Sequence, residues 1–211
     1  MNPVTTLLIA RHGNTFGPDE TVRRVGLTDL PLVESGLLQG HALGAYLKKN
    51  QLIPDVIFTS TLKRTLQTAE QAQLAMQTHL PLQPLKIFNE IDYGIDENKP
   101  ETAVIARLGQ AALQAWETQA HVPTGWQVNP EEIIQHWQDF STQLTQDYRG
   151  KIILVITSNG IARFAPYLTG DFASFSAQHS IKIATGGLCL FEKTLTDSAW
   201  RCLQWNIKPP L

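Results

Sequence analysis

The stretch LLIARHG at residues 7–13 decides the fold, because it is a short apolar run that ends directly in charged residues. Residues 7–10 are apolar without interruption, as in strands that are covered on both faces of a parallel sheet. Arg11 and His12 follow where such a strand would end. Because ligands of open α/β sheets bind at the carboxyl ends of the strands, the stretch predicts a central strand with a polar site behind it.

Two more runs have the same character. KIILVIT at residues 151–157 is followed by Ser158, Asn159 and Gly160, and DVIFTS at residues 55–60 is followed one helical turn later by Arg64. Between the strands, residues 35–50 and 61–76 carry apolar side chains at helical spacing. This alternation predicts an α/β fold in which helices pack on a mostly parallel sheet.

The second half of the chain predicts helices over residues 102–117 and 130–148, joined by a loop that contains proline and glycine. Residues 180–187 and the rest of the C-terminal part predict strands around a turn at residues 196–198, an antiparallel hairpin at one sheet edge that could pair two chains into a homodimer. No repeat or linker interrupts the sequence, so we expect a single domain over residues 1–211 with a small helical cap inserted at roughly 95–148.

The composition is that of an ordinary soluble globular protein. The chain has 211 residues, 43% of them hydrophobic and 17% charged, with a formal net charge of -2, so nothing indicates binding to nucleic acid or to a membrane surface. No apolar run approaches the roughly 20 residues that span a bilayer, and we expect a cytoplasmic protein. Cys189 and Cys202 lack metal-ligand spacing and are interpreted as buried apolar residues, with neither a zinc site nor a disulfide.

The polar turns behind the three predicted strands are expected to meet at one edge of the sheet. They offer two guanidinium groups, from Arg11 and Arg64, together with the His12 imidazole and the Asn159 amide. Guanidinium forks match phosphate oxygens, and each charge-assisted hydrogen bond contributes about 1.5–3 kcal/mol. The pattern therefore predicts that a phosphate anion or a small phosphorylated metabolite binds here.

Four segments resemble one known family. ARHGNT at residues 10–15 resembles the RHG[E/N/Q]T signature of the histidine phosphatase superfamily, which has the phosphoglycerate mutase-like fold. Residues 25–36, 59–69 and 88–94 are similar to further segments of that family, in the same order. The resemblance implies a three-layer α/β/α sandwich with a mostly parallel central sheet, an antiparallel edge and a helical cap.

The resemblance also implies a reaction. His12 would attack phosphorus and form a phosphohistidine without a metal or another cofactor, while Arg11, Asn14 and Arg64 would hold the phosphoryl oxygens. Glu90 would protonate the leaving oxygen and later deprotonate water. The residues alone leave other carboxylates open for the acid role, namely Asp92, Asp96, Glu97 and Glu101. Position in the family pattern favours Glu90.

One departure concerns the second turn. Members of the family usually carry a second histidine where this chain has Asn159, with Gly160 after it. Asn159 can still donate from its amide to a phosphoryl oxygen, so we expect both residues to bind phosphate in a slower enzyme rather than a dead one; Asn159 could equally be a helix N-cap. With one cation fewer, the pKa of His12 would be higher than in a two-histidine site, and activity would shift to higher pH.

Three further residues are candidates for substrate binding. Arg23 and Arg24 could reach the distal part of a substrate or simply face water, and His179, just before the predicted strand at residues 180–187, could replace the absent histidine. The favoured function is a metal-independent phosphomonoester phosphatase. The alternatives are phosphoglycerate mutase-type transfer and a phosphate-binding or regulatory protein with weakened catalysis, and the cap would set the substrate.

Overall fold

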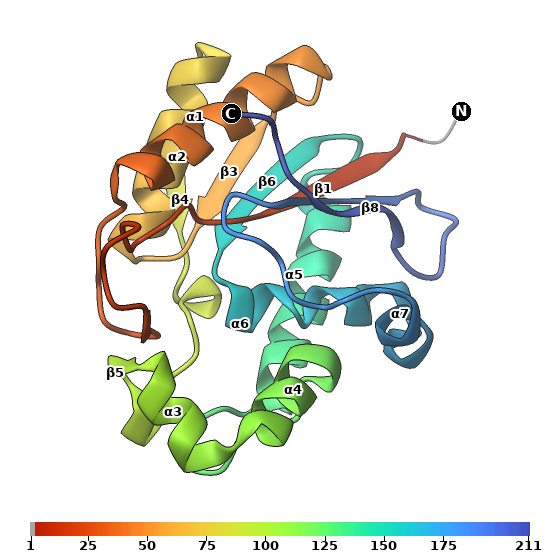
Figure 1. Ribbon diagram of the computed structural model, residues 1–211. Coiled ribbons are helices and arrows are strands. Elements are labelled where there is room, and N and C mark those ends of the chain that lie inside the picture. Colours follow the sequence, from red (N-terminus) through yellow and green to blue (C-terminus); the bar gives the residue numbers. More distant parts are fainter. Residues whose placement is uncertain (1–2) are drawn as a thin grey trace.

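A six-stranded sheet forms the centre of the structure, a computed structural model that describes residues 3–211 (Figure 1). The strands lie in the order β4-β3-β6-β1-β7-β8, and a separate two-stranded ribbon pairs β2 with β5. The strands are β1 (Thr5–Arg11), β2 (Arg23–Arg24), β3 (Val56–Thr59), β4 (Leu82–Pro84), β5 (Lys99–Pro100), β6 (Ile152–Thr157), β7 (Leu188–Lys193) and β8 (Arg201–Ile207).

The pairing confirms the predicted mostly parallel sheet with an antiparallel edge. β1 runs parallel to β6, with Leu8 opposite Leu154, and β6 in turn runs parallel to β3. β7 is antiparallel to β1, and β8 is antiparallel to β7, so the predicted C-terminal hairpin is confirmed. β8 lies at the edge of the sheet, and a homodimer formed through it stays a prediction.

Helices cover both faces of the sheet (Figure 1). They are α1 (Glu34–Lys49), α2 (Lys63–Met76), α3 (Glu101–Leu108), α4 (Gln110–Gln119), α5 (Pro130–Asp147), α6 (Asn159–Ala162) and α7 (Phe172–Gln178), with single 3-10 turns η1 (Lys86–Phe88), η2 (Gly94–Asp96) and η3 (Ala165–Thr169). None of the helices within residues 3–211 combines the length and the apolar character that crossing a membrane requires.

The alternating side chains of β1 explain the three layers. Leu8 and Ala10 pack on one face, in a core with residues of α1 and α2, whereas Leu7 and Ile9 pack on the other face with residues of α5. Successive side chains of a strand point to opposite faces, and all four of these are fully buried, so the uninterrupted apolar run was the correct sign of a strand covered on both sides.

The predicted cap region contains three helices that differ in what they contact. The single helix expected over residues 102–117 is broken at Gly109, whose φ of 80° is a conformation that glycine tolerates, and this break separates α3 from α4. α5 begins at the Asn129 cap with Pro130 in its first turn, and it packs on the sheet through Phe140, whose ring centroid lies 5.0 Å from that of Phe58. α5 thus belongs to the layer that covers the sheet, and a cap extending over 95–148 stays a prediction.

The segment 180–187 differs from the prediction. Its alternation of apolar residues suggested a strand, but β7 begins only at Leu188. Residues 180–187 instead run without regular structure past the ends of β1 and β6. There the main chain of Ile183 binds the side chains of Arg11, the last residue of β1, and of Asn159, which follows β6. Both cysteines are free thiols. Cys189 is buried as predicted, but Cys202 is only half-buried because it lies in the edge strand β8, so that prediction is wrong for Cys202.

Candidate active site

A cavity of about 450 Å³ lies where the three predicted polar turns meet, at the carboxyl ends of β1, β3 and β6. Of the ten residues that the sequence predicted to bind or react, eight line this cavity. These eight are Arg11, His12, Asn14, Arg23, Arg24, Arg64, Glu90 and Asn159. The fold therefore brings together groups that are up to 148 positions apart in the sequence.

His12 is buried at the end of β1, with one ring nitrogen fixed. Its Nδ1 lies 2.7 Å from the carbonyl oxygen of Gly13. A carbonyl can only accept, so Nδ1 carries the proton and Nε2 keeps a free lone pair. Burial lowers the pKa of His12 well below its ordinary value, and the charges of Arg64 and Arg11 lower it further. The imidazole is therefore neutral and has the form that a nucleophile needs.

The same pKa bears on the expected shift of activity to higher pH, which compares this site with a two-histidine site and stays a prediction. Activity would shift to higher pH if His12 kept its proton at neutral pH. In this cavity the lowered pKa of His12 favours the neutral imidazole instead. Deprotonation of free His12 thus gives no reason for activity to move to alkaline pH.

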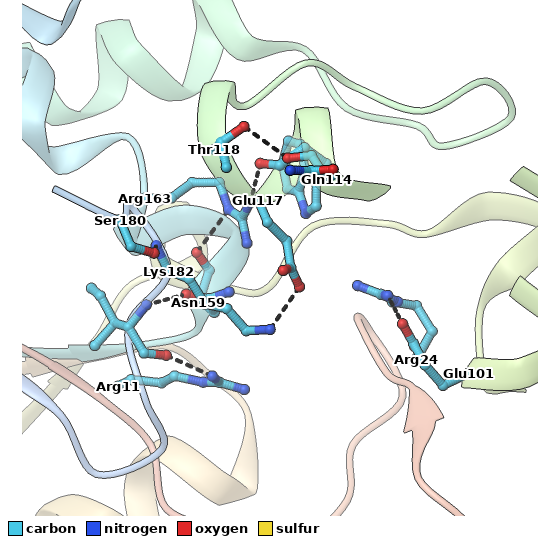
Figure 2. Close-up of polar contacts among 12 residues, drawn as sticks. Arg11, Arg24, Glu101, Gln114, Glu117, Thr118, Asn159, Arg163, Ser180 and Lys182 are labelled. Atoms are coloured by element: carbon cyan, nitrogen blue, oxygen red, sulfur yellow. Dashed lines mark hydrogen bonds and ion pairs between the residues drawn. The ribbon is translucent and has the colours of Figure 1, made fainter. Parts of the chain in front are cut away.

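Arg11 and Asn159 are held by one residue of the segment 180–187. Nη1 of Arg11 donates to the carbonyl of Ile183 at 2.6 Å, and the Oδ1 atom of Asn159 accepts from the N–H of the same residue at 2.9 Å (Figure 2). Because Oδ1 is the acceptor, the Asn159 amide NH₂ is directed elsewhere and remains available as a donor. The helix that starts here is capped at Ser158, so Asn159 is not its N-cap residue.

Arg64 is fixed by main-chain carbonyls. Its Nη1 donates to Thr28 at 2.9 Å and its Nη2 donates to Gly26 at 2.6 Å. The Glu97 carboxylate in turn accepts from the N–H groups of Gly26 and Thr28 and from the Thr28 hydroxyl. Glu97, one of the competing acids, therefore positions Arg64 through this loop. Burial lowers the pKa of Arg64, while the Glu90 charge acts in the opposite direction.

Glu90 is buried in the cavity with both oxygens oriented. Oε1 accepts from the N–H of Ile91 at 2.9 Å, and Oε2 accepts from the N–H of Gly160 at 3.2 Å. Each carboxyl oxygen has a second lone pair, so a proton can still be exchanged with a ligand. Two of the other competing acids are paired with cations: Asp96 binds Arg107 and also Trp126, and Glu101, which lines the same cavity, pairs with Arg24.

Gly160 is not among the residues that line the cavity, and a contact between Gly160 and phosphate stays a prediction. Its N–H is engaged by Glu90, and a Cβ atom there would lie 2.2 Å from Glu90 Oε1. Only a glycine allows the carboxylate to come this close. Gly160 therefore positions Glu90.

Asn14 lies in the cavity wall and braces the first turn. Its Oδ1 accepts from the Thr185 hydroxyl at 2.5 Å, its Nδ2 donates to Ser35 at 3.2 Å, and its N–H donates to Gln39 at 2.8 Å. These contacts hold the turn after β1 against α1 and against the segment 180–187. A direct contact between Asn14 and phosphate stays a prediction.

The two tandem arginines form part of the outer wall. Arg24 pairs with Glu101 at the start of α3, and its guanidinium lies 5.5 Å from the Tyr93 ring centroid (Figure 2). Arg23 lies over Phe16, with 5.5 Å between the guanidinium carbon and the ring centroid. Both residues line the cavity, and a contact of either with the distal part of a substrate stays a prediction.

His179 lies outside the cavity, so the structure does not bring it together with the other predicted site residues. It follows α7, and its ring packs on Phe175 with centroids 4.7 Å apart, beside a different cavity. Because the segment 180–187 is not a strand, Lys182 and Thr185 reach the cavity in its place.

Sequence reasoning missed three charged residues of the cavity: Arg163, Lys182 and Glu117. Arg163 is buried, donates to the carbonyls of Asn159 and Trp116, and lies 4.0 Å from the Trp116 ring centroid. Lys182 pairs with Glu117 of α4 at 2.6 Å (Figure 2). The available signal for Arg163 was its position one helical turn after Asn159, whereas nothing in the sequence placed α4 beside Lys182.

The arrangement combines a neutral imidazole, two fixed guanidiniums, an amide donor and an oriented carboxyl group. Such a set can bind a phosphoryl dianion, attack it and exchange a proton with its leaving oxygen. Within residues 3–211, no group of three or more histidine, cysteine, aspartate or glutamate side chains is placed to hold a metal ion.

Comparisons with known proteins find one family and one fold. The histidine phosphatase superfamily (branch 1) matches residues 7–208. A 2,3-bisphosphoglycerate-dependent phosphoglycerate mutase from Clavibacter michiganensis is 31% identical over 119 residues, which cover 56% of this chain and 47% of the mutase. The chain spans about half the length of the first curated relatives that it matches.

Two solved structures show the same fold. A mycobacterial glucosyl-3-phosphoglycerate phosphatase superposes with a TM-score of 0.77 at 20% identity, covering 96% of this chain and 99% of that one. A phosphoglycerate mutase from Bacillus anthracis superposes with a TM-score of 0.79 at 20% identity, covering 97% of this chain and 94% of that one. The predicted phosphoglycerate mutase-like fold is confirmed.

Proposed function

Because the chain belongs to the histidine phosphatase superfamily (branch 1), we propose that it is a phosphomonoesterase that works through a phosphohistidine on His12. The observation that carries the proposal is the 2.7 Å contact between Nδ1 of His12 and the carbonyl of Gly13, inside a cavity that keeps the imidazole neutral. This contact leaves Nε2 as the nucleophile.

In the first step, Nε2 of His12 forms a bond to phosphorus while the bond from phosphorus to the ester oxygen breaks. Glu90 gives its proton to the departing alkoxide, so the alcohol leaves neutral. Arg11 and Arg64 hold the phosphoryl oxygens, and their carbonyl partners on Ile183, Thr28 and Gly26 keep both guanidiniums in place. The fixed donors stabilise charge where it develops and need no rearrangement.

In the second step, water attacks the phosphohistidine and Glu90 accepts its proton. The bond from phosphorus to Nε2 breaks, inorganic phosphate leaves, and His12 is again neutral. The N–H groups of Ile91 and Gly160 hold the Glu90 carboxylate in the same orientation during both proton transfers. The amide of Asn159 donates to a phosphoryl oxygen, with its own oxygen anchored to Ile183.

The substrate class is a small phosphorylated metabolite. A cavity of about 450 Å³ with Arg23, Arg24 and Lys182 in its wall supports a compact and polar ligand. The relatives that are named phosphoglycerate mutases support a second candidate, in which the phosphoryl group passes from His12 to an acceptor hydroxyl instead of water.

The test is phosphate release from a panel of phosphomonoesters, with the native protein and with His12→Asn. The proposal expects turnover that His12→Asn abolishes, and preferred substrates will identify the metabolite class. Transfer of the phosphoryl group to an added acceptor such as glycerate, faster than its release to water, would favour the mutase. Native protein that binds phosphate but hydrolyses no ester would contradict the phosphatase and leave a binding protein.

A further inference from the structure

Lys182 and Glu117 form an ion pair inside the cavity. Nζ of Lys182 lies 2.6 Å from Oε1 of Glu117, and both side chains are partly exposed, at 49% and 39%. Lys182 comes from the segment 180–187 and Glu117 from α4, so the pair joins the sheet side of the cavity to the cap helices (Figure 2). The steps proposed for catalysis give this pair no role.

The position of Lys182 is fixed beside the predicted phosphate ligands. The next residue, Ile183, accepts from Arg11 Nη1 through its carbonyl and donates its N–H to Asn159 Oδ1. Lys182 lines the same cavity as these two side chains, and Figure 2 shows its side chain extending from this anchored main chain toward Glu117. The main chain that carries the ammonium group is thus anchored to both predicted phosphate ligands.

The cations of the cavity differ in what holds them. Arg11 and Arg64 are held by neutral carbonyl oxygens, so their charge is not cancelled by their partners. The charge of Lys182 is cancelled by a carboxylate. Partly exposed ion pairs of this kind contribute little to stability, so a doubly charged anion can compete with Glu117 for the ammonium group.

We propose, on the basis of the phosphoryl transfer described above, that Lys182 is a mobile cation of the phosphoryl site and that Glu117 is its counter-ion in the empty enzyme. When the dianion binds, Lys182 leaves Glu117 and pairs with a phosphoryl oxygen beside Asn159. Lys182 then supplies positive charge at the position where the neutral Asn159 amide supplies only a hydrogen bond.

The proposal predicts effects of opposite sign for the two partners. Lys182→Met removes a charged ligand and weakens phosphate binding by about tenfold, the lower range for a charge-assisted hydrogen bond. Glu117→Gln frees Lys182 and strengthens phosphate binding several-fold. A pair that only tethered α4 to the segment 180–187 would instead give two variants with the same direction of change.

The experiment measures the dissociation constant of inorganic phosphate by isothermal titration calorimetry for the native protein, both single variants and the double variant. Glu117→Gln is expected to strengthen phosphate binding only when Lys182 is present. In the Lys182→Met background, the same substitution should leave the phosphate dissociation constant unchanged. The difference between native protein and Lys182→Met is also expected to shrink at high salt, where partly exposed charges are screened.

A matched control exists at the opposite end of β6. Lys151 pairs with Asp55 at 2.9 Å, with similar exposures of 54% and 39%. Lys151→Met is expected to leave phosphate binding unchanged.

Two results would overturn the proposal: phosphate binding by Lys182→Met within twofold of the native protein, or an undiminished gain from Glu117→Gln in the Lys182→Met background. The phosphate dissociation constant can be measured without turnover, so the experiment tests the mobile cation separately from the proposed phosphatase activity. Phosphate binding with the predicted signs but no ester hydrolysis would overturn the phosphatase and support the mobile cation. Hydrolysis with unchanged binding in both variants would overturn the mobile cation alone.

Discussion

At the scale of single residues, main-chain groups position much of the site. Ile183 is apolar and buried, yet its carbonyl fixes Arg11 and its N–H fixes Asn159. Residue types and motif positions predicted the reacting side chains correctly as members of one cavity. They could not predict that Ile183 binds both Arg11 and Asn159, because it does so through main-chain groups that every residue type except proline has.

The first prediction tests the Asn159 donor with an isosteric change. Asn159→Asp keeps an oxygen acceptor for the Ile183 N–H but replaces the amide donor with a negative charge next to the bound phosphoryl group. We expect kcat/KM to fall by at least about 10²-fold, the usual loss when an oxyanion donor is removed. Steady-state hydrolysis of a phosphomonoester measures it.

Asn206→Asp is the matched control for that variant. Asn206 Oδ1 accepts from the N–H of Ala184 at 2.8 Å, next to Ile183, but Asn206 does not line the cavity. Its kcat/KM should match the native value. Equal losses in both variants would assign the effect to the segment 180–187 and contradict a direct role for the Asn159 amide.

The second prediction concerns the close approach of Gly160 to Glu90. In Gly160→Ala, the new methyl group would overlap the Glu90 carboxylate and move it, so kcat should fall by about 10²-fold or more while KM changes little. Gly17→Ala is the control, since a Cβ atom there meets only the Glu20 side chain at 3.4 Å. An unchanged kcat for Gly160→Ala would show that Glu90 does not need its present position.

The third prediction follows from the lowered pKa of His12. The unfolded chain binds a proton at His12 near pH 6.5, while the folded protein resists it, so the unfolded state binds more protons below that pH. His12 therefore costs no stability above about pH 6.5 and destabilises the fold progressively below it, by up to about 1.4 kcal/mol per pH unit. Burial and the two arginines are the cause.

The measurement is the urea midpoint of the native protein and of His12→Asn between pH 5 and 8. The variant should lose less stability on acidification, because its residue 12 does not titrate, and the other histidines are common to both proteins. Parallel pH profiles would contradict a low pKa for His12.

At the scale of elements, the uninterrupted and the periodic apolar patterns predicted the central strands and the first two crossover helices. The apolar pattern gave wrong secondary structure at two places, and in both the main-chain geometry determined the structure. The positive φ of Gly109 divides one predicted helix into two, and residues 180–187 alternate like a strand but are used to bind Arg11 and Asn159. Periodicity reports which side chains are buried and does not report which main-chain groups are paired.

The fourth prediction concerns the turn that leads into α3. The buried Asp96 carboxylate accepts from Arg107 Nε and from Trp126 Nε1, both at 2.7 Å. Asp96→Ala leaves the Trp126 N–H buried without its acceptor, and we expect the free energy of unfolding to fall by about 2 kcal/mol or more. Chemical denaturation measures the change.

Asp147→Ala, at an exposed position near the end of α5, serves as the control and should stay within about 0.5 kcal/mol of the native protein. A stability of Asp96→Ala equal to that of the control would contradict a structural role for the Asp96 contacts.

At the scale of the whole molecule, the fold brings together site residues that lie far apart in the sequence. The sheet order places the turns after β1, β3 and β6 at one edge, and α3 and α4 add Glu101 and Glu117 to the same cavity. The motifs predicted the sheet side of the site because parallel strands end together. The motifs could not predict the side of the site that α3 and α4 form, because no sequence pattern indicates where these two helices pack.

The measurement that tests the central claim most directly is rapid quenching of the native protein with a ³²P-labelled phosphomonoester, followed by peptide mapping. The account predicts an acid-labile and base-stable label on the peptide that contains His12, and none in His12→Asn. Steady hydrolysis by His12→Asn at the native rate, or a label on another residue, would contradict phosphoryl transfer through His12.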